Sequence, residues 1–163
     1  MPLGTALVLT LSDSAAAGNR EDLSGPAAAG ILEDAGFEIK AIEILADDRA
    51  TIEARLLKAC AEGIRLIVTT GGTGLSPRDV TPEATLAVID KAVPGISELM
   101  RSEGFKKTPR AALSRGVAGV RESTLIINLP GSVKGVRECL GAVRPILAHA
   151  VETLQQSSLG CGE

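Results

Sequence analysis

A glycine-rich segment followed by fixed charge lies near the middle of the chain. The segment "TTGGTGLSPRDVTPEAT", residues 69–85, has glycines at positions 71, 72 and 74 and a charged pair, Arg78 and Asp79. Glycines permit positive φ angles and carry no Cβ, so consecutive N–H groups of such a segment can converge on a phosphate. The glycines alone favour a plain tight turn, because the segment matches neither common nucleotide-binding glycine motif. The charged pair shifts the interpretation toward phosphate chemistry.

Carboxylates in and near this segment predict a metal ion. Asp47 and Asp48 follow an apolar run, and either can cap the next helix, most simply Asp48, which leaves Asp47 free. Asp79 is placed either to cap a helix or to hold Mg²⁺ against phosphates. Several carboxylates would repel an anionic substrate, and a bridging Mg²⁺ is the ordinary solution for a nucleoside triphosphate. The sequence therefore predicts a magnesium site on Asp47 and Asp79, while leaving open whether Asp47 or Asp48 touches the metal.

Two further loops offer polar groups. "SDS" at residues 12–14 follows the first apolar run, and Ser24 stands at a helix entrance whose N–H groups can bind an anion. The alternative for Ser24 is a plain helix cap. "LPGSVKG" at residues 129–135 is either a binding loop or a turn with a solvated Lys134. His149 has no serine, cysteine or acid at a catalytic spacing, so it is interpreted as structural, and neither a nucleophile triad nor a zinc site is indicated.

The elements that position these loops alternate between strand and helix patterns. Strands are predicted at residues 5–11, 37–45 and 64–70, a hairpin at 117–120 and 124–128, and helices at 26–35, 46–63, 82–91, 94–104 and 136–154. Thr81 is the predicted cap of the helix at 82–91. The predicted apolar faces are Ile52, Leu56, Leu57 and Cys60 in one helix and Cys139, Leu140, Val143, Ile146 and Leu147 in the last.

This alternation predicts an α/β fold with a mainly parallel sheet covered on both faces and a small β-hairpin. At 163 residues the chain fits a single domain, 1–163, with residues 155–163 as a flexible tail. Ligands of such sheets sit outside the carboxyl ends of the strands. The polar loops are therefore expected to gather in one crevice.

Composition excludes several classes of function. The chain has 17 basic and 20 acidic side chains, a formal charge of −3, and only two aromatic residues, Phe37 and Phe105. Nonspecific binding to nucleic acid or to anionic membranes needs a cationic excess that is missing here, and stacking platforms for bases need aromatic rings. Three cysteines without a C-x-x-C pair, and no apparent leader peptide, predict a cytoplasmic location. No apolar run has the roughly 18 residues that a membrane-spanning helix needs.

Several long strings occur together in the order found in one known family. They are the segment 69–85, "SDS", "DLSGP" at 22–26, "LSRGVAGVRESTLIINLPGS" at 113–132 and "VREC" at 136–139. Over about residues 7–154, the chain resembles the molybdopterin adenylyltransferase family, which includes the Mog-type and MoaB-type bacterial proteins and the G and E domains of plant Cnx proteins and gephyrin. The resemblance implies a three-layer α/β/α fold, a homotrimer and activation of the pterin cofactor for molybdenum insertion, with a molybdenum insertase among the possible partners.

The resemblance also implies a reaction and a set of site residues. The terminal phosphate of molybdopterin would attack the α-phosphorus of Mg-ATP, giving adenylylated molybdopterin and pyrophosphate. Asp79 and Asp47 match the family's essential aspartates, as catalytic residues and Mg²⁺ ligands. The implied residues that bind the two substrates, ATP and molybdopterin, are Asp13, Ser14, Ser24, Gly25, Gly71, Gly72, Thr73, Gly74, Ser76, Pro130, Gly131 and Ser132. Val133 departs from the family pattern, in which many members have proline.

Two alternatives compete with the enzyme. One is a binding protein of the same fold, which holds molybdopterin or assembles the cofactor without catalysis, and the presence of both Asp47 and Asp79 favours the enzyme over it. An E-type domain, which promotes molybdate insertion, is disfavoured because such domains usually belong to longer chains. The other is a generic flavodoxin-like nucleotide binder, which would explain the glycines but not the Arg78–Asp79 pair together with "LSRGVAGVREST".

Overall fold

Four of the six strands run parallel and end at one edge of a single sheet. The computed structural model, which describes residues 1–159, has the strand order β2-β1-β3-β6-β5-β4. The strands are β1 (Thr5–Leu11), β2 (Glu38–Leu45), β3 (Leu66–Thr70), β4 (Lys91–Ala92), β5 (Ala118–Arg121) and β6 (Thr124–Leu129). β1 pairs in parallel with β2 and β3, and β3 with β6, whereas β5 runs antiparallel to β4 and β6. The predicted mainly parallel sheet and the β5–β6 hairpin are confirmed.

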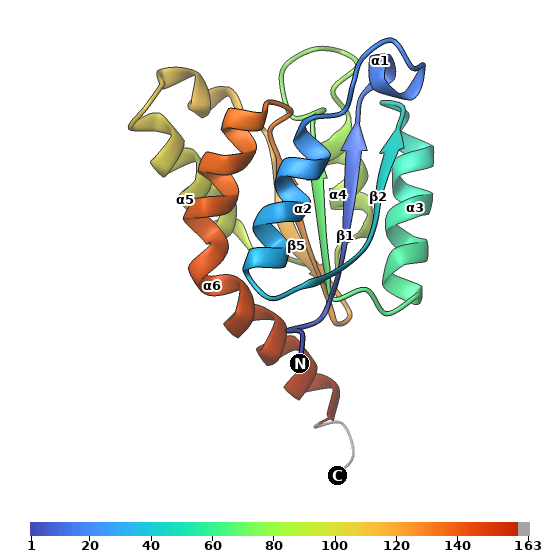
Figure 1. Cartoon of the computed structure of the whole chain (residues 1–163), viewed down its shortest axis with the longest axis vertical. Coiled ribbons are helices and arrows are strands. Elements are labelled where there is room, and N and C mark those ends of the chain that lie inside the picture. The colour runs from blue at the N-terminus through green and yellow to red at the C-terminus, as the bar shows by residue number, and fades with distance from the viewer. Residues whose placement is uncertain (160–163) are drawn as a thin grey trace.

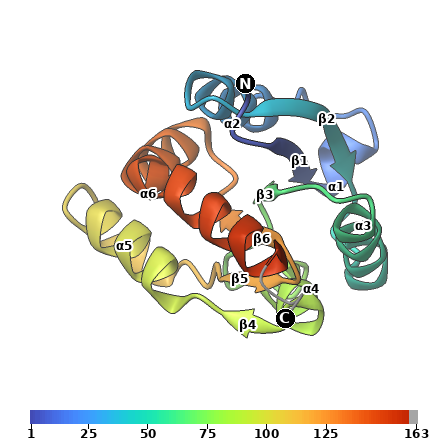
Figure 2. The ribbon, with the colours of Figure 1, turned by 90° about the horizontal axis from the view of Figure 1, so that it is seen from below.

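Helices cover both faces of this sheet (Figures 1 and 2). One face carries α2 (Ser24–Asp34), α5 (Pro94–Phe105) and α6 (Val133–Leu159), and the other carries α3 (Arg49–Ala61) and α4 (Thr81–Val88). Side chains of a strand alternate between faces, so Val8 packs with the first set of helices and Leu7 with the second. The apolar side chains on both faces of the sheet are buried under these helices. The fold therefore has three layers, α/β/α.

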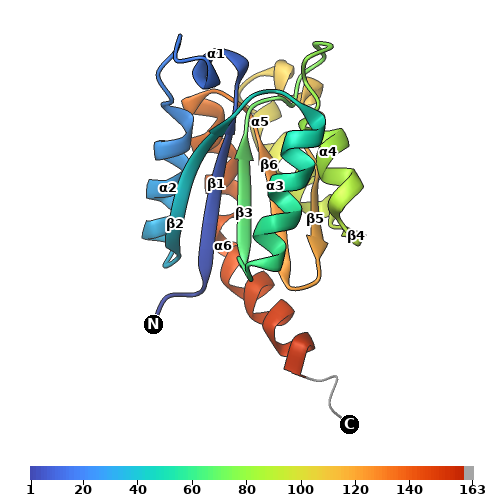
Figure 3. The same ribbon diagram turned by 90° about the vertical axis from the view of Figure 1, so that its right-hand side faces the viewer.

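The carboxyl ends of the parallel strands create the crevice that the sequence predicts. The register pairs Leu11 with Leu45 and Thr70 with Leu129, so the four strands end level with one another. The loops at 12–23, 46–48, 71–80 and 130–132 leave these ends together, at the upper end of the sheet in Figure 3. Because β2 and β3 lie on opposite sides of β1, the chain changes direction at this point, which is where ligands of open α/β sheets bind.

The structure corrects several predicted boundaries. α6 continues to Leu159, past the predicted end at 154, so residues 155–159 of the predicted tail are helical and residues 160–163 lie outside the described part of the chain. α4 ends at Val88, because the chain turns there into β4, whose pairing with β5 the short sequence "KA" does not predict. The short helices α1 (Asp13–Ala16) and η1 (Pro109–Leu113) were also not predicted.

Other differences concern caps and apolar faces. Val80, without a side-chain hydrogen bond, is the N-cap of α4, and Thr81 lies inside the helix with its hydroxyl donating to Gly71 O at 3.0 Å. A tertiary partner for Thr81 therefore replaces the predicted cap. Leu57 and Ile146, predicted on buried helix faces, are each 41% exposed. Each of these helices buries a narrower face than its set of apolar residues predicts. No helix within residues 1–159 combines the length and apolarity needed to cross a membrane.

Candidate active site

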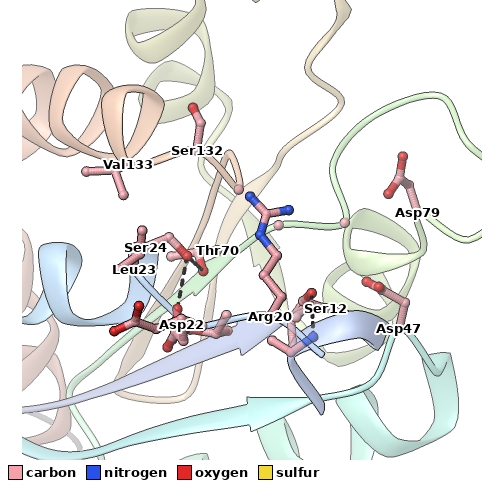
Figure 4. A pocket seen from close by; sticks show the side chains of 17 residues that line it. Ser12, Arg20, Asp22, Leu23, Ser24, Asp47, Thr70, Asp79, Ser132 and Val133 are labelled. Atoms are coloured by element: carbon pink, nitrogen blue, oxygen red, sulfur yellow. Dashed lines mark hydrogen bonds between the residues drawn. The ribbon is translucent and has the colours of Figure 1, made fainter. Parts of the chain in front are cut away.

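Two adjacent pockets lie at the carboxyl edge of the sheet and share Ser132. The first pocket has a volume of about 440 Å³ and is lined by the end of β1, Ser12, Ala15, residues 20–24, Asp47, residues 70–72, Asp79 and residues 131–133 (Figure 4). The second pocket, of about 350 Å³, lies between α5, η1 and the start of α6. The segment 71–74 passes from the first pocket into the second. The glycine-rich loop is therefore the boundary between the two cavities.

Asp13 fixes the loop that carries Asp47. Asp13 N donates to Asp47 Oδ2 at 3.0 Å, and Asp47 N donates to Asp13 Oδ1 at 2.9 Å. Arg78 donates from Nε and Nη2 to the two oxygens of Asp13, each at 2.9 Å. The hydrogen bond from the Asp47 backbone and those from Arg78 lower the pKa of Asp13. Asp13 thus stays ionised and ties together two loops that are 34 and 65 residues away in sequence.

The second oxygen of Asp47 is available to a cation. Asp47 Oδ1 is buried and receives no hydrogen bond from the described residues. Burial raises the pKa of Asp47, and the negative charges of Asp13 and Asp79 raise it further. Residues 1–159 contain no group of three or more histidines, cysteines or acids that could hold a metal alone. Asp47 and Asp79 both line the first pocket, and their carboxylates fit Mg²⁺, which proteins commonly hold with one or two carboxylates together with substrate phosphates.

Arg115 holds the loop that carries Asp79. Its Nε donates to Gly74 O at 2.7 Å, its Nη2 donates to Asp79 O at 2.9 Å, and its backbone N donates to Thr73 O at 2.9 Å. Nη1 also pairs with Glu83 in the first turn of α4. A side chain from the segment before β5 therefore clamps both ends of the loop. The Asp79 side chain itself accepts a hydrogen bond from Ser76 N at 3.1 Å, which closes a turn instead of capping α4.

The glycines of this loop are required by close neighbours. Gly71 and Gly72 have φ angles of 90° and 67°, which L-residues rarely adopt. A Cβ at Gly72 would lie 2.2 Å from Thr81 Oγ1 and 3.1 Å from Asp47 Oδ1. A Cβ at Gly74 would lie 2.8 Å from Asp79 Oδ2. Gly72 and Gly74 thus make room for a carboxylate or for the hydroxyl that holds the loop, and Gly71 makes room for Leu11 O.

The start of α2 is organised by Asp22. Its Oδ1 accepts from Gly25 N at 2.9 Å and its Oδ2 accepts from Thr10 Oγ1 at 2.8 Å. Ser24 is the first helical residue, and its hydroxyl shares a hydrogen bond of 2.8 Å with Thr70 Oγ1. Ser24 therefore does not cap α2. The N–H group of Gly25, predicted to be free for an anion, already has an internal partner.

The second pocket has a different chemical character. Apolar groups of Met100, Leu113 and Cys139 line it together with Arg101, Arg110 and Lys134. Ser97, which is 3% exposed, also lines this pocket, and its Oγ has no hydrogen-bond partner among the described residues. Arg101 is held in place by donating to Ser114 O and Gly116 O. The combination suits a ligand that has an apolar part, a hydrogen-bonding group and an anionic group.

Comparison with known proteins places this geometry in a family. Residues 7–149 match the MoCF_biosynth model, described as a probable molybdopterin binding domain. The chain belongs to this family. It is 47% identical to the molybdopterin adenylyltransferase of Helicobacter pylori J99, over 90% of this chain and 85% of that protein, and 40% identical to that of Escherichia coli K12, over 88% and 75%. The crystal structure of the molybdopterin biosynthesis enzyme MoaB from Thermus thermophilus superposes with a TM-score of 0.88 at 51% identity, covering 94% of this chain and 97% of that one.

In this member of the MoCF_biosynth family, the residues predicted from the sequence divide between the pockets. The first pocket is lined by Ser24, Asp47, Gly71, Gly72, Asp79, Gly131 and Ser132, and the second by Thr73, Gly74, Pro130 and Ser132. Asp13, Ser14, Gly25 and Ser76 line neither of these two pockets; Asp13, Gly25 and Ser76 make the internal contacts described above, and Ser14 Oγ lies 3.2 Å from Ser12 Oγ on the surface. Asp48, the alternative metal ligand, caps α3 by accepting from Thr51 N and Oγ1. Of the two neighbouring aspartates, only Asp47 lines the first pocket.

Three residues that shape or line the site were not predicted from the sequence. They are Arg115, Asp22 and Arg20. Arg115 donates to Gly74, which lies 41 residues earlier in the chain, and Asp22 accepts from Thr10, which lies 12 residues earlier. A single sequence carries no signal for such pairs. Arg20 had a local signal, a lone cation in an otherwise acidic loop that follows a strand.

The partly buried charge of Asp47 predicts an effect on stability. Because the folded-state pKa of Asp47 is raised, the ionised carboxylate destabilises the fold above that pKa, and this cost disappears as the pH falls through it. Asp47→Asn keeps an acceptor for Asp13 N and removes the charge. In the absence of Mg²⁺ and substrates, we expect the Tm of this variant at pH 7 to exceed that of the wild type by up to roughly 2–4 °C. This corresponds to a gain in the free energy of unfolding of about 1 kcal/mol or less, because solvent screens the charge of a half-exposed group.

Thermal unfolding monitored by circular dichroism at a series of pH values measures this effect. The gain of Asp47→Asn shrinks as the pH falls from 7 into the acidic range. Asp48→Asn serves as the control, because the hydrogen bonds from Thr51 lower the pKa of Asp48 and removing its charge brings no stabilisation. A Tm for Asp47→Asn equal to or below that of the wild type at pH 7 would show that Asp47 carries no such charge cost.

Proposed function

We propose that the chain is a molybdopterin adenylyltransferase of molybdenum cofactor biosynthesis, which transfers AMP from Mg-ATP to the terminal phosphate of molybdopterin and releases pyrophosphate. The observation that carries the proposal is the convergence of Asp47 and Asp79 on one pocket beside the glycine-rich loop, with Asp47 Oδ1 buried and unpartnered within the described chain. The names of the relatives point to the same activity.

The two pockets suit the two substrates. The first pocket, with Asp47, Asp79 and the glycine-rich loop, is assigned to Mg-ATP, and the second, with its apolar surface and buried Ser97 hydroxyl, is assigned to the pterin. Ser132 belongs to both pockets, so a phosphate of one substrate and the α-phosphate of the other would meet near it. The arrangement aligns two anionic substrates for direct transfer, which is the main requirement of phosphoryl chemistry.

The reaction balances without a covalent intermediate on the protein. An oxygen of the molybdopterin phosphate forms a bond to the α-phosphorus, and the bond from that phosphorus to the oxygen bridging to the β-phosphate breaks, so pyrophosphate leaves with the electron pair. Asp47 and Asp79 would hold Mg²⁺, which would neutralise charge that builds up on the leaving pyrophosphate. Asp13, Arg78 and Arg115 keep the two aspartates in place. Gly72 and Gly74 leave space beside them.

A nucleotide analogue tests this assignment. Wild-type protein with molybdopterin, Mg²⁺ and ATP should form adenylylated molybdopterin and pyrophosphate in equal amounts. α,β-Methylene-ATP, in which carbon replaces the oxygen of the bond that breaks, should bind but give no product. Product formed from the analogue would contradict cleavage between the α- and β-phosphates. Binding of molybdopterin without product from ATP would favour the alternative, a molybdopterin-binding or cofactor-assembly protein of the same fold.

We also propose that residues 1–163 form one domain, that the protein is cytoplasmic and that it assembles as a homotrimer able to deliver its product to a molybdenum insertase. The trimer rests on the family resemblance. Multi-angle light scattering tests it, since three chains of 16.7 kDa give a mass of about 50 kDa. A mass of one chain would remove the trimer from the proposal without changing the chemistry of the two pockets.

A further inference from the structure

Arg20 is the sole lysine or arginine among the residues that line the first pocket. It lies on the connection between α1 and α2, and the same pocket is lined by four acids, Glu21, Asp22, Asp47 and Asp79. Figure 4 shows the Arg20 side chain reaching into the pocket, with its guanidinium group turned away from Asp47. An anionic ligand in this pocket would therefore meet a single lysine or arginine charge, that of the exposed Arg20.

The guanidinium group of Arg20 is unused within the described chain. Arg20 makes no hydrogen bond or ion pair with residues 1–159, although Glu21 and Asp22 are its neighbours in sequence. The carboxylate of Asp22 is already engaged by Thr10 and Gly25. By contrast, Arg78 is bound to Asp13, and Arg115 is bound to Glu83 and two carbonyl groups, so neither of these is free for a ligand.

The chemistry of a free guanidinium group selects its ligand. Its five N–H donors lie in a planar fork that matches two oxygens of a phosphate, and the charge is permanent at any physiological pH. The pocket is also lined by Gly71 and by Ser24 at the start of α2, but the N–H groups of Gly71 and Gly25 already donate to Leu129 O and Asp22 Oδ1. A triphosphate in a pocket with four acids needs positive charge at more than one point, because Mg²⁺ at Asp47 and Asp79 compensates only part of it.

We propose that Arg20 binds the triphosphate of the nucleotide in the first pocket, on the side of the phosphate chain away from the aspartate pair. This inference rests on the proposed function, because it takes Mg-ATP as the ligand of this pocket. It adds a phosphate-binding residue that fixes the nucleotide for transfer. Because the guanidinium fork matches phosphate oxygens, Arg20 should favour triphosphate and pyrophosphate over the unphosphorylated nucleoside.

Isothermal titration calorimetry of the full chain with three probes tests the inference. Arg20→Met keeps the apolar stem and should weaken binding of Mg-ATP and of Mg-pyrophosphate by roughly 10- to 100-fold, the loss expected for a charge-assisted bidentate contact. Adenosine should bind with unchanged affinity. Arg20→Lys should recover part of the affinity, because it restores the charge without the fork. Since Arg20 has no contact to lose, the Tm of both variants should equal that of the wild type.

A matched control and two outcomes decide the result. Arg137, an exposed cation of α6 that lines neither pocket and makes no hydrogen bond or ion pair within residues 1–159, is the control, and Arg137→Met should leave ATP affinity unchanged. Unchanged affinity of Arg20→Met for ATP and pyrophosphate would overturn the inference, and so would a loss confined to molybdopterin, which would assign Arg20 to the phosphate of the pterin. Wild-type protein that binds no ATP would instead refute the proposed function, so the two failures are distinguishable.

Discussion

Asp79→Asn lowers the rate of adenylyl transfer by roughly 100- to 1000-fold and changes the Kd for molybdopterin by less than about twofold. The asparagine retains an oxygen that can accept from Ser76 N, so the turn that carries residue 79 stays closed. What the substitution removes is one negative charge beside the buried Oδ1 of Asp47. Charge stabilisation at the leaving group acts mainly in the transition state, and its loss therefore lowers the rate more than the binding of the pterin.

Rapid-quench measurement of the single-turnover rate constant, together with equilibrium binding of molybdopterin, checks this prediction. Asp48→Asn is the matched control, because Asp48 is adjacent to Asp47 but serves as the N-cap of α3, a position that asparagine also fills well. It should retain the wild-type rate. Loss of pterin affinity in Asp79→Asn equal to its loss of rate would contradict the role of Asp79 in catalysis. A slow Asp48→Asn variant would reopen the assignment of the metal to Asp47.

Gly72→Ala abolishes measurable ATP binding, or weakens it by at least about 30-fold, in a protein that still folds. Position 72 has a φ of 67°, and the new Cβ would lie 2.2 Å from Thr81 Oγ1 and 3.1 Å from Asp47 Oδ1. The loop must move to relieve this contact, and it breaks the hydrogen bond from Thr81 to Gly71 O or displaces Asp47. A displaced loop no longer fits the phosphates, so ATP affinity falls; any transfer that remains should also slow on the order of 100-fold, the usual cost of a displacement of about 1 Å at a reacting centre.

Gly63→Ala separates backbone strain from the local clash. Gly63 has a φ of 78°, and a Cβ there would have no neighbour within 4 Å, so this substitution carries only the cost of the left-handed conformation, about 1 kcal/mol. It should lower the Tm slightly and leave ATP affinity unchanged. A second substitution, Gly74→Ala, introduces no strain from a positive φ, but its Cβ would lie only 2.8 Å from Asp79 Oδ2. Normal ATP affinity in Gly72→Ala would return the glycine-rich loop to the role of a plain turn.

Local patterns predicted the fold well because its determinants are local. The apolar run "LIVTT" of β3 is buried at every position, and alternating helices enforce parallel strands, so the gathering of the polar loops follows from topology. The cap at Asp48 followed from its position before Arg49 and Ala50. The boundary of α4 did not follow, because Thr81 found a tertiary partner at Gly71 and β4 exists only through its pairing with β5.

Several residues that line the two pockets were predicted from the sequence, but their geometry was not. Asp47, Asp79 and the glycines were singled out from the sequence, and all of them lie in or between the two pockets. The division into two pockets, the clamp formed by Arg115 and the coupling of Asp13 to Arg78 depend on contacts between segments far apart in the chain. Asp13 is an example, because its local sequence does not show whether its carboxylate is free or bound by an arginine.

A single turnover of wild-type protein with molybdopterin and Mg-ATP labelled at the α-phosphorus tests whether the protein is an adenylyltransferase. The label should move to the pterin as adenylylated molybdopterin, with one pyrophosphate released for each molecule formed. Tight binding of molybdopterin with no transfer of label and no pyrophosphate would contradict it, and the two pockets would then belong to a pterin carrier or assembly factor rather than to a nucleotidyltransferase.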